Sequence, residues 1–128
     1  MSEPVWLTVE MIVAIHEAQL VEHGGPPGIR DQGMLESALG RPRNKWAYEI
    51  GHLAAMAAAY GYGIARNHPF VDGSKRTSLM AIFVFLGLNG VDFDVPEADF
   101  AAIILSLAAG EVNEEGLTRW LRDNWPKA

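Results

Sequence analysis

Residues 66–79, RNHPFVDGSKRTSL, hold the densest group of chemically reactive side chains in the chain. The imidazole of His68 can accept a proton from a hydroxyl near neutral pH. The carboxylate of Asp72 can bind a divalent cation, and Lys75 and Arg76 can hold phosphate groups. A proton acceptor, a metal ligand and two cations within nine residues are the parts that phosphoryl or nucleotidyl transfer requires.

These side chains lie where a helix is expected to begin. The pattern predicts a helix that starts at residues 73–75 and runs to about Leu88, after Pro69 has ended the preceding helix. Backbone N–H groups in a first helical turn lack partners and carry partial positive charge, and Gly73 lets a ligand approach them closely. Two cations in the same turn oppose the helix dipole, and a bound phosphate would resolve that conflict.

Each residue of this group also has a structural interpretation. Asp72 could cap the helix by accepting from the N–H of Ser74 or Lys75. His68 could bond to the backbone, the two cations could form a solvated turn, and Phe70 is expected in the core. For each residue alone, the structural interpretation is the more common one. The occurrence of all these residues within nine positions favours a role in catalysis or ligand binding.

Length and composition exclude several classes of protein. The chain has 128 residues, which fits one domain, and 49% of them are hydrophobic. It has no apolar run long enough to cross a membrane, and the start, MSEPVWLTVE, lacks the basic residues of a secretory signal. The absence of cysteine fits the cytoplasm. A net charge of −6 argues against direct nucleic-acid binding, which needs a basic surface.

Apolar periodicity and capping residues predict an all-α fold of about six helices, and one short hairpin or strand in residues 23–30 stays open. The run SLMAIFVFLGL is apolar nearly all round, which predicts a buried central helix. The segment VDFDV is either a short strand or an extended link. Helices are expected over residues 9–22, capped by Thr8, and around residues 34–39, capped by Asp31 and closed by Gly40 and Pro42. Two more are expected over residues 47–65 and 73–88. The last two are expected over residues 97–109, opened by Pro96, and after Asn113, which caps the final helix.

The motif HPFVDGSKRT resembles the signature of the Fic/Doc family, whose pattern is roughly H-P-F-x-[D/E]-G-N-[G/K]-R. Lys75 and the RTSL that follows it resemble the death-on-curing (Doc) toxin branch more than the main Fic branch, where glycine usually replaces the lysine. The segments HGGPPGIRDQGMLESALGRP and FLGLNG extend the resemblance over nearly the whole chain.

The resemblance implies one compact all-α domain over residues 1–128 and the toxin of a type II toxin–antitoxin system. Such a toxin resembles a kinase: it moves the terminal phosphate of ATP, with Mg²⁺, to a threonine of elongation factor Tu and arrests translation. AMP transfer to a protein hydroxyl and a non-catalytic interaction module remain the alternatives. The roles implied are general base for His68, Mg²⁺ ligand for Asp72, phosphate clamp for Arg76, anion-binding turn for Gly73, Ser74 and Lys75, and core anchor for Phe70.

Further expectations follow from the same resemblance. Ser74 replaces the family's usual asparagine, and its hydroxyl can donate a hydrogen bond or cap the helix. Residues 20–30 would form a flap that aligns the target protein by backbone pairing. The inhibitory pattern [S/T]-x-x-x-E-[G/N] is absent, so a separate antitoxin is expected as a partner. An apolar groove formed partly by the first helix or the C-terminal helices is its expected seat.

The remaining polar residues receive structural interpretations. His16, inside the first helix, is expected to have a structural role, and His23 to form a turn rather than to assist the flap. Four histidines without helical pairing, and no cysteine, argue against a zinc site. The basic residues Arg41, Arg43 and Lys45 are expected in a solvated loop, with a partner's acidic surface as the alternative.

Overall fold

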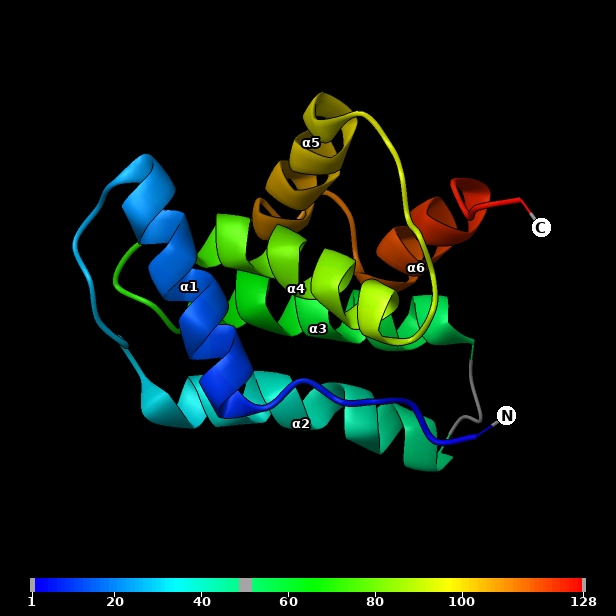
Figure 1. Ribbon diagram of the computed structural model, residues 1–128, viewed down its shortest axis with the longest axis horizontal. Helices are drawn as coiled ribbons and strands as arrows, with labels where there is room; N and C mark the ends of the chain where they lie inside the picture. The colour runs from blue at the N-terminus through cyan, green and yellow to red at the C-terminus, as the bar shows by residue number, and fades with distance from the viewer. Residues whose placement is uncertain (1, 49–51, 128) are drawn as a thin grey trace.

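The computed structural model describes residues 2–48 and 52–127, which fold into helices joined by short loops (Figure 1). The helices are α1 (Val9–His23), α2 (Gln32–Tyr48), α3 (Leu53–Asn67), α4 (Ser74–Leu88), α5 (Glu97–Ala108) and α6 (Glu114–Asp123). The prediction of a compact all-α fold of about six helices is confirmed.

No strand forms within these two described stretches, and the hairpin that stayed open in residues 23–30 is reduced to one antiparallel bridge between Ile29 and Phe70. The segment VDFDV is an extended link. None of the helices in this part of the chain is long and apolar enough to span a membrane.

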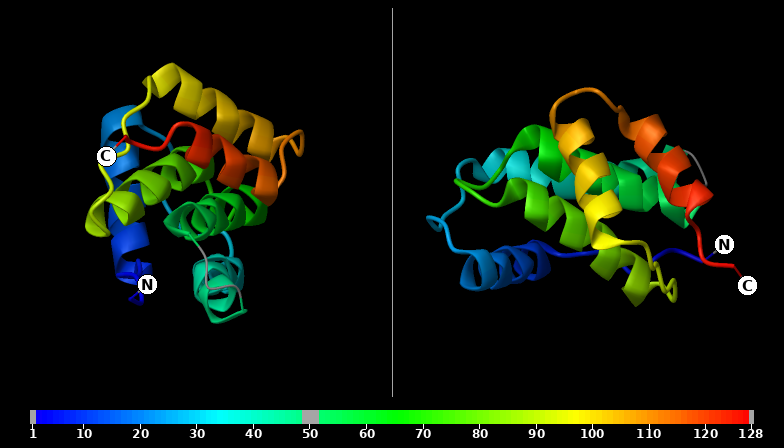
Figure 2. Two further views of the ribbon diagram at one scale, coloured as in Figure 1. Left: turned by 90° about the vertical axis from the view of Figure 1, so that its right-hand side faces the viewer. Right: turned by 90° about the horizontal axis from the view of Figure 1, so that it is seen from above.

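The centre of the bundle is α3, which contacts α2, α4, α5 and α6. Figures 1 and 2 show α2 on one side of the α3–α4 pair and α5 on the other. The prediction that α4 is the buried central helix is wrong in part, because Phe83 and Leu88 of α4 are each 45% exposed. Alanine and glycine give α3 a thin profile, so four other helices can approach it.

Two glycines of α3 permit the closest of these approaches. A Cβ atom on Gly63 would lie 3.0 Å from the Cα atom of Ala38 in α2. A Cβ atom on Gly61 would overlap the side chain of Ile82 in α4. The backbone of α3 therefore packs directly against the neighbouring helices at both positions, which fixes α3 relative to α2 and α4.

The second helix is longer than the sequence predicts. It was expected to end at Gly40 and Pro42, but it continues through both to Tyr48. Pro42 is buried, and its ring removes one helical hydrogen bond. The buried side chains of α2, among them Leu35 and Leu39, lie in the same core as α3, and this packing outweighs the local preference of proline to end a helix.

The expected helix over residues 47–65 begins later, at Leu53. Residues 47 and 48 belong to α2, and residues 49–51 lie outside the described residues. His52 caps α3, because its Nδ1 atom accepts from the N–H of Ala54 at 3.1 Å. Partial burial, and secondarily the charge of Arg122, lower the pKa of His52, which favours the neutral ring that can accept this bond.

The expected capping residues of three other helices are confirmed. Each accepts a hydrogen bond from a backbone N–H in the first turn of its helix. These bonds are Met11 N–H to Thr8 at 3.1 Å, Met34 N–H to Asp31 at 3.0 Å and Gly116 N–H to Asn113 at 2.8 Å.

The basic residues of α2 do not form a solvated loop, and that prediction is wrong. Arg41 and Lys45 both bind the buried carboxylate of Glu114 at the start of α6, with N–O distances of 2.5 and 2.6 Å. Arg43 lies over the ring of Trp6. Because Glu114 binds both Arg41 and Lys45, these two cations join α2 to α6.

A matched pair of glycine substitutions tests the close packing of α3. Gly63→Ala places a methyl group against the backbone of Ala38, so we expect the free energy of unfolding to fall by about 1–3 kcal/mol. Gly40→Ala, also in a helix, meets no atom within 4 Å and should raise it by about 0.5–1 kcal/mol. Urea denaturation measures both, and equal effects would contradict the packing described here.

Candidate functional site

The candidate site lies where the C-terminal end of α3 meets the N-terminal end of α4. Residues 68–73 join the two helices, and the loop from α1 to α2 lies beside them at the same end of the molecule (Figure 1). The motif residues therefore lie in the loop that leads into α4 and in the first turn of that helix.

The first turn of α4 has three backbone N–H groups without a protein acceptor. Gly73 precedes the helix in a left-handed conformation, with φ at 82°, and offers no side-chain cap. The N–H groups of Ser74, Lys75 and Arg76 make no hydrogen bond within residues 2–48 and 52–127. Free N–H groups at a helix start form a binding site for anions.

Two exposed cations stand in this turn. Lys75 makes no ion pair with any other described residue. Arg76 donates from Nη1 to Nε2 of His23 at 2.9 Å, and Nε2 of His23 lies 3.7 Å from a carboxylate oxygen of Glu22. His23 therefore does more than form a turn, because it holds the guanidinium at the end of α1.

The backbone of His68 is held in an unusual conformation. Pro69 was expected to push His68 out of the helical region, and it does, but into the left-handed region with φ at 49° and ψ at 56°. No other non-glycine residue in the described chain has a positive φ. This conformation costs about 1–2 kcal/mol for a residue with a Cβ atom, and its imidazole is exposed to solvent.

Asp72 does not cap α4 as the structural interpretation proposed. Its Oδ1 atom accepts from the N–H of Gly73 at 2.9 Å, and its side chain is exposed. Gly25, in the loop after α1, lies so close that a Cβ atom there would overlap Oδ2 of Asp72. One exposed carboxylate can bind Mg²⁺ together with the phosphates of a nucleotide, since Mg²⁺ commonly uses one or two carboxylates and substrate oxygens.

Ser74 and Phe70 stabilise the loop between α3 and α4 on its buried side. Both are buried, and the N–H of Phe70 donates to Oγ of Ser74 at 3.3 Å. The Ser74 hydroxyl does not cap α4, and no hydrogen bond from it to another described residue is found. The hydroxyl therefore supports the loop, and the backbone N–H is the polar group of Ser74 that has no partner among the described residues.

His16 lies directly beneath the motif loop, which sequence reasoning did not foresee. Its ring is 97% buried and stacks on Phe70, with centroids 3.8 Å apart and planes within 8°. Its Nε2 atom donates to the carbonyl of Asp72 at 2.7 Å, and a Cβ atom on Gly73 would lie 3.5 Å from the ring. The only signal in the sequence was its position on the apolar side of α1.

The loop between α1 and α2 pairs with the motif. The N–H of Arg30 donates to the carbonyl of Pro69 at 2.7 Å, and the N–H of Val71 donates to the carbonyl of Gly28 at 3.0 Å. In this pattern the N–H and C=O groups of Ile29 point away from Phe70. Neither group of Ile29 bonds to another described residue, so the loop presents a free backbone edge.

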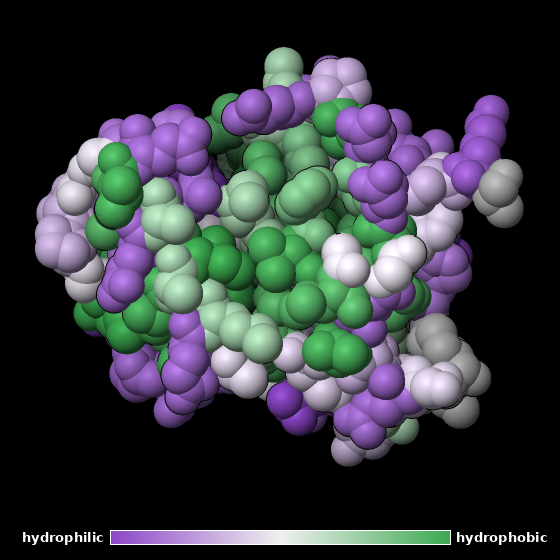
Figure 3. Space-filling model, in the orientation of Figure 1, coloured by the Kyte–Doolittle hydropathy of each residue, from purple (hydrophilic) through white to green (hydrophobic). Residues whose placement is uncertain are grey.

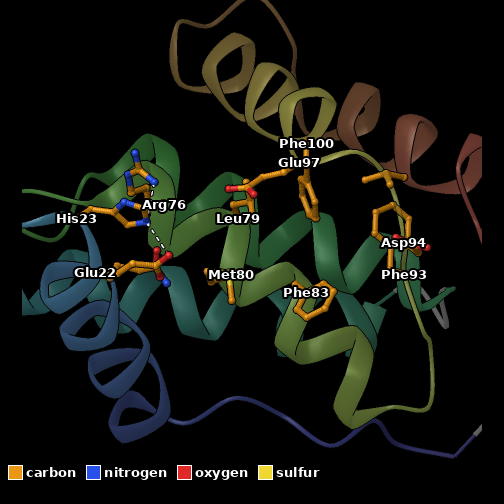
Figure 4. A pocket seen from close by; sticks show the side chains of 12 residues that line it. Glu22, His23, Arg76, Leu79, Met80, Phe83, Phe93, Asp94, Glu97 and Phe100 are labelled. Atoms are coloured by element: carbon orange, nitrogen blue, oxygen red, sulfur yellow. Dashed lines mark hydrogen bonds and ion pairs between the residues drawn. The ribbon is translucent and has the colours of Figure 1, made fainter.

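An apolar groove leads away from the start of α4. It consists of two adjoining cavities of about 330 and 520 Å³ that share Arg76, Leu79 and Glu97. Figure 4 shows Phe83, Phe93 and Phe100 along the first cavity, and Figure 3 shows hydrophobic surface across this face. A groove was expected to be formed partly by the first helix or the C-terminal helices, and this one lies between α1, α4 and α5.

Comparisons with known proteins agree on one family. The profile of the Fic/DOC family matches residues 6–86. "Protein kinase doc" of Escherichia phage P1 is 37% identical over 118 residues, which are 91% of this chain and 92% of that protein. "Toxin Doc" of Mycolicibacterium smegmatis is 41% identical over 86 residues, which are 62% of this chain and 65% of that protein.

Replacement of His16 tests its support of the loop. His16→Phe keeps a buried ring beside Phe70 but leaves the carbonyl of Asp72 without its donor, so we expect a loss of about 1–3 kcal/mol in the free energy of unfolding. We also expect weaker binding of pyrophosphate, because Gly73 loses its support. Denaturation and calorimetric titration measure the two effects, and wild-type values in both would contradict the role given to His16.

Proposed function

Since this chain belongs to the Fic/DOC family, we propose that it is the toxin of a toxin–antitoxin pair and transfers the terminal phosphate of Mg–ATP to a protein hydroxyl. The observation that carries this proposal is the start of α4, where three free N–H groups stand beside two exposed cations. A nucleotide's phosphates match that arrangement in charge and in hydrogen bonding.

In the proposed reaction, His68 accepts the proton of the target hydroxyl. The hydroxyl oxygen then forms a bond to the terminal phosphorus, the bond between that phosphorus and the bridging oxygen breaks, and ADP leaves. Lys75, Arg76 and the N–H groups of the first turn stabilise the negative charge on the transferred group. Asp72 would hold Mg²⁺, which neutralises phosphate charge when it is bound.

The choice of phosphate over AMP rests on Lys75 and on the name of a relative. Lys75 stands where AMP-transferring members of the family usually have glycine, and the 37%-identical phage protein is called a protein kinase. AMP transfer remains the alternative product. Elongation factor Tu is the target protein proposed from the family resemblance.

The target segment would bind to the free edge of the loop between α1 and α2. The outward N–H and C=O groups of Ile29 can pair with an extended peptide as a sheet edge does. Ile29 pairs with Phe70, two residues after His68, so a peptide on this edge would pass close to the proposed base.

The antitoxin would bind to the groove between α1, α4 and α5. Its apolar lining suits the apolar face of a helical segment, and Arg76 at its end offers a partner to an acidic side chain. An occupant that held Arg76 would compete with phosphate for the same guanidinium, which would keep the toxin inactive.

A transfer assay with His68→Ala tests the enzymatic proposal. The variant should lose at least about 100-fold of the transfer rate from γ-labelled ATP to elongation factor Tu, because it lacks the proton acceptor. His52→Asn, which keeps a capping acceptor for α3, is the control and should retain activity. If wild type and His68→Ala behave alike in the assay and in arrest of cell growth, the protein is a non-catalytic module.

Substitution of Lys75 tests the product. Mass spectrometry of elongation factor Tu after incubation with wild type and Mg–ATP should show the gain of one phosphate. Lys75→Gly restores the residue found in AMP-transferring members, so we expect phosphate transfer to fall and AMP adducts to appear. AMP adducts from the wild type would move the assignment to the alternative product.

A further inference from the structure

Arg30 binds three consecutive carbonyl groups around the proposed base. Its Nε atom donates to the carbonyl of His68 at 2.7 Å, and its Nη2 atom donates to the carbonyl of Asn67 at 2.8 Å. Its backbone N–H donates to the carbonyl of Pro69. One residue of the loop between α1 and α2 therefore binds all three residues over which the chain leaves α3.

The chemistry of these contacts is favourable. The C-terminal end of α3 carries free carbonyl groups and a partial negative charge, which a guanidinium neutralises. The side chain of arginine is planar, so its two donors have a fixed direction and separation. Two such bonds fix the carbonyl directions of Asn67 and His68 together, and these directions determine the left-handed backbone of His68.

The backbone conformation of His68 determines where its imidazole points. His68 is exposed, and its ring makes no hydrogen bond with the described residues, so no hydrogen bond of the ring itself orients it. The hydrogen bonds of Arg30 act on the backbone from which the ring projects.

The same arginine joins the base to the edge where the target would bind. Ile29, whose N–H and C=O groups face outward, directly precedes Arg30. Two further hydrogen bonds connect this loop to the residues around His68. The N–H of Asp31 donates to the carbonyl of Pro69, and the N–H of Val71 donates to the carbonyl of Gly28. A displacement of the loop would therefore displace the backbone of His68.

We propose that Arg30 is a positioning residue, which locks the left-handed backbone of His68 and couples the orientation of the imidazole to the loop that receives the target. This inference rests on the proposed function, which gives His68 its role as base. Among the described residues, Arg30 makes no hydrogen bond or ion pair with the first turn of α4, so its loss should slow transfer without weakening the binding of nucleotide.

A purely structural role makes a different prediction. As a C-terminal cap of α3, Arg30 would affect the free energy of unfolding and nothing else. Arg30 and His68 are both exposed, whereas α3 is held by its buried side chains, so variants of Arg30 should fold.

The test compares wild type with Arg30→Lys, and with Arg43→Lys as a matched control on another exposed arginine. Lysine keeps the charge but cannot bond two carbonyl groups in a fixed geometry. We measure kcat for transfer from γ-labelled ATP to elongation factor Tu, Kd for Mg–ATP by calorimetry, and hydrogen exchange of the N–H groups of Asp31 and Val71.

For Arg30→Lys we expect kcat to fall about tenfold or more, since small misplacements of a reacting group slow catalysis strongly, and Kd to stay within about twofold. Exchange at Asp31 and Val71 should accelerate, while Arg43→Lys matches wild type throughout. An unchanged kcat with unchanged exchange overturns the inference, as does a parallel loss of nucleotide affinity. If wild type and Arg43→Lys transfer no phosphate while both bind Mg–ATP, the proposed function fails instead.

Discussion

Three backbone N–H groups at the start of α4, without an acceptor in the described chain, impose the main constraint on this structure. Such groups stay in contact with solvent or bind a ligand, because an unpaired buried donor costs free energy. The surroundings keep the turn open: Gly73 has no side chain, and the hydroxyl of Ser74 bonds inward to Phe70. His16 stacks on Phe70 and donates to the carbonyl of Asp72, which supports the loop from its buried side.

The site joins two helix ends of opposite polarity. The carbonyl end of α3 carries partial negative charge and binds the guanidinium of Arg30, whereas the N–H end of α4 is positive and is free for an anion. Close packing at Gly61 fixes the two helices relative to each other. The fold therefore holds the end of α3 and the start of α4 in one arrangement, which would suit the proposed transfer between two bound substrates.

Local signals in the sequence predicted local features well. Thr8, Asp31 and Asn113 cap helices because a capping bond spans three residues and needs no distant partner. The start of α4 and its cations followed from the motif for the same reason. Features that depend on distant contacts were missed: α2 continues through Pro42, α3 replaces α4 at the centre, and Glu114 binds two cations from another helix. His16 and Arg30 belong to this group, because only the folded chain places them against the motif loop.

The most direct test follows the N–H resonances of Ser74, Lys75 and Arg76 by NMR while Mg²⁺ and a non-hydrolysable ATP analogue are added. If the start of α4 holds the phosphates, these three resonances should shift the most, and they should return when the nucleotide is removed. Binding that leaves all three unshifted, or that shifts only resonances in the groove between α1, α4 and α5, would contradict the assignment of this turn as the phosphate site.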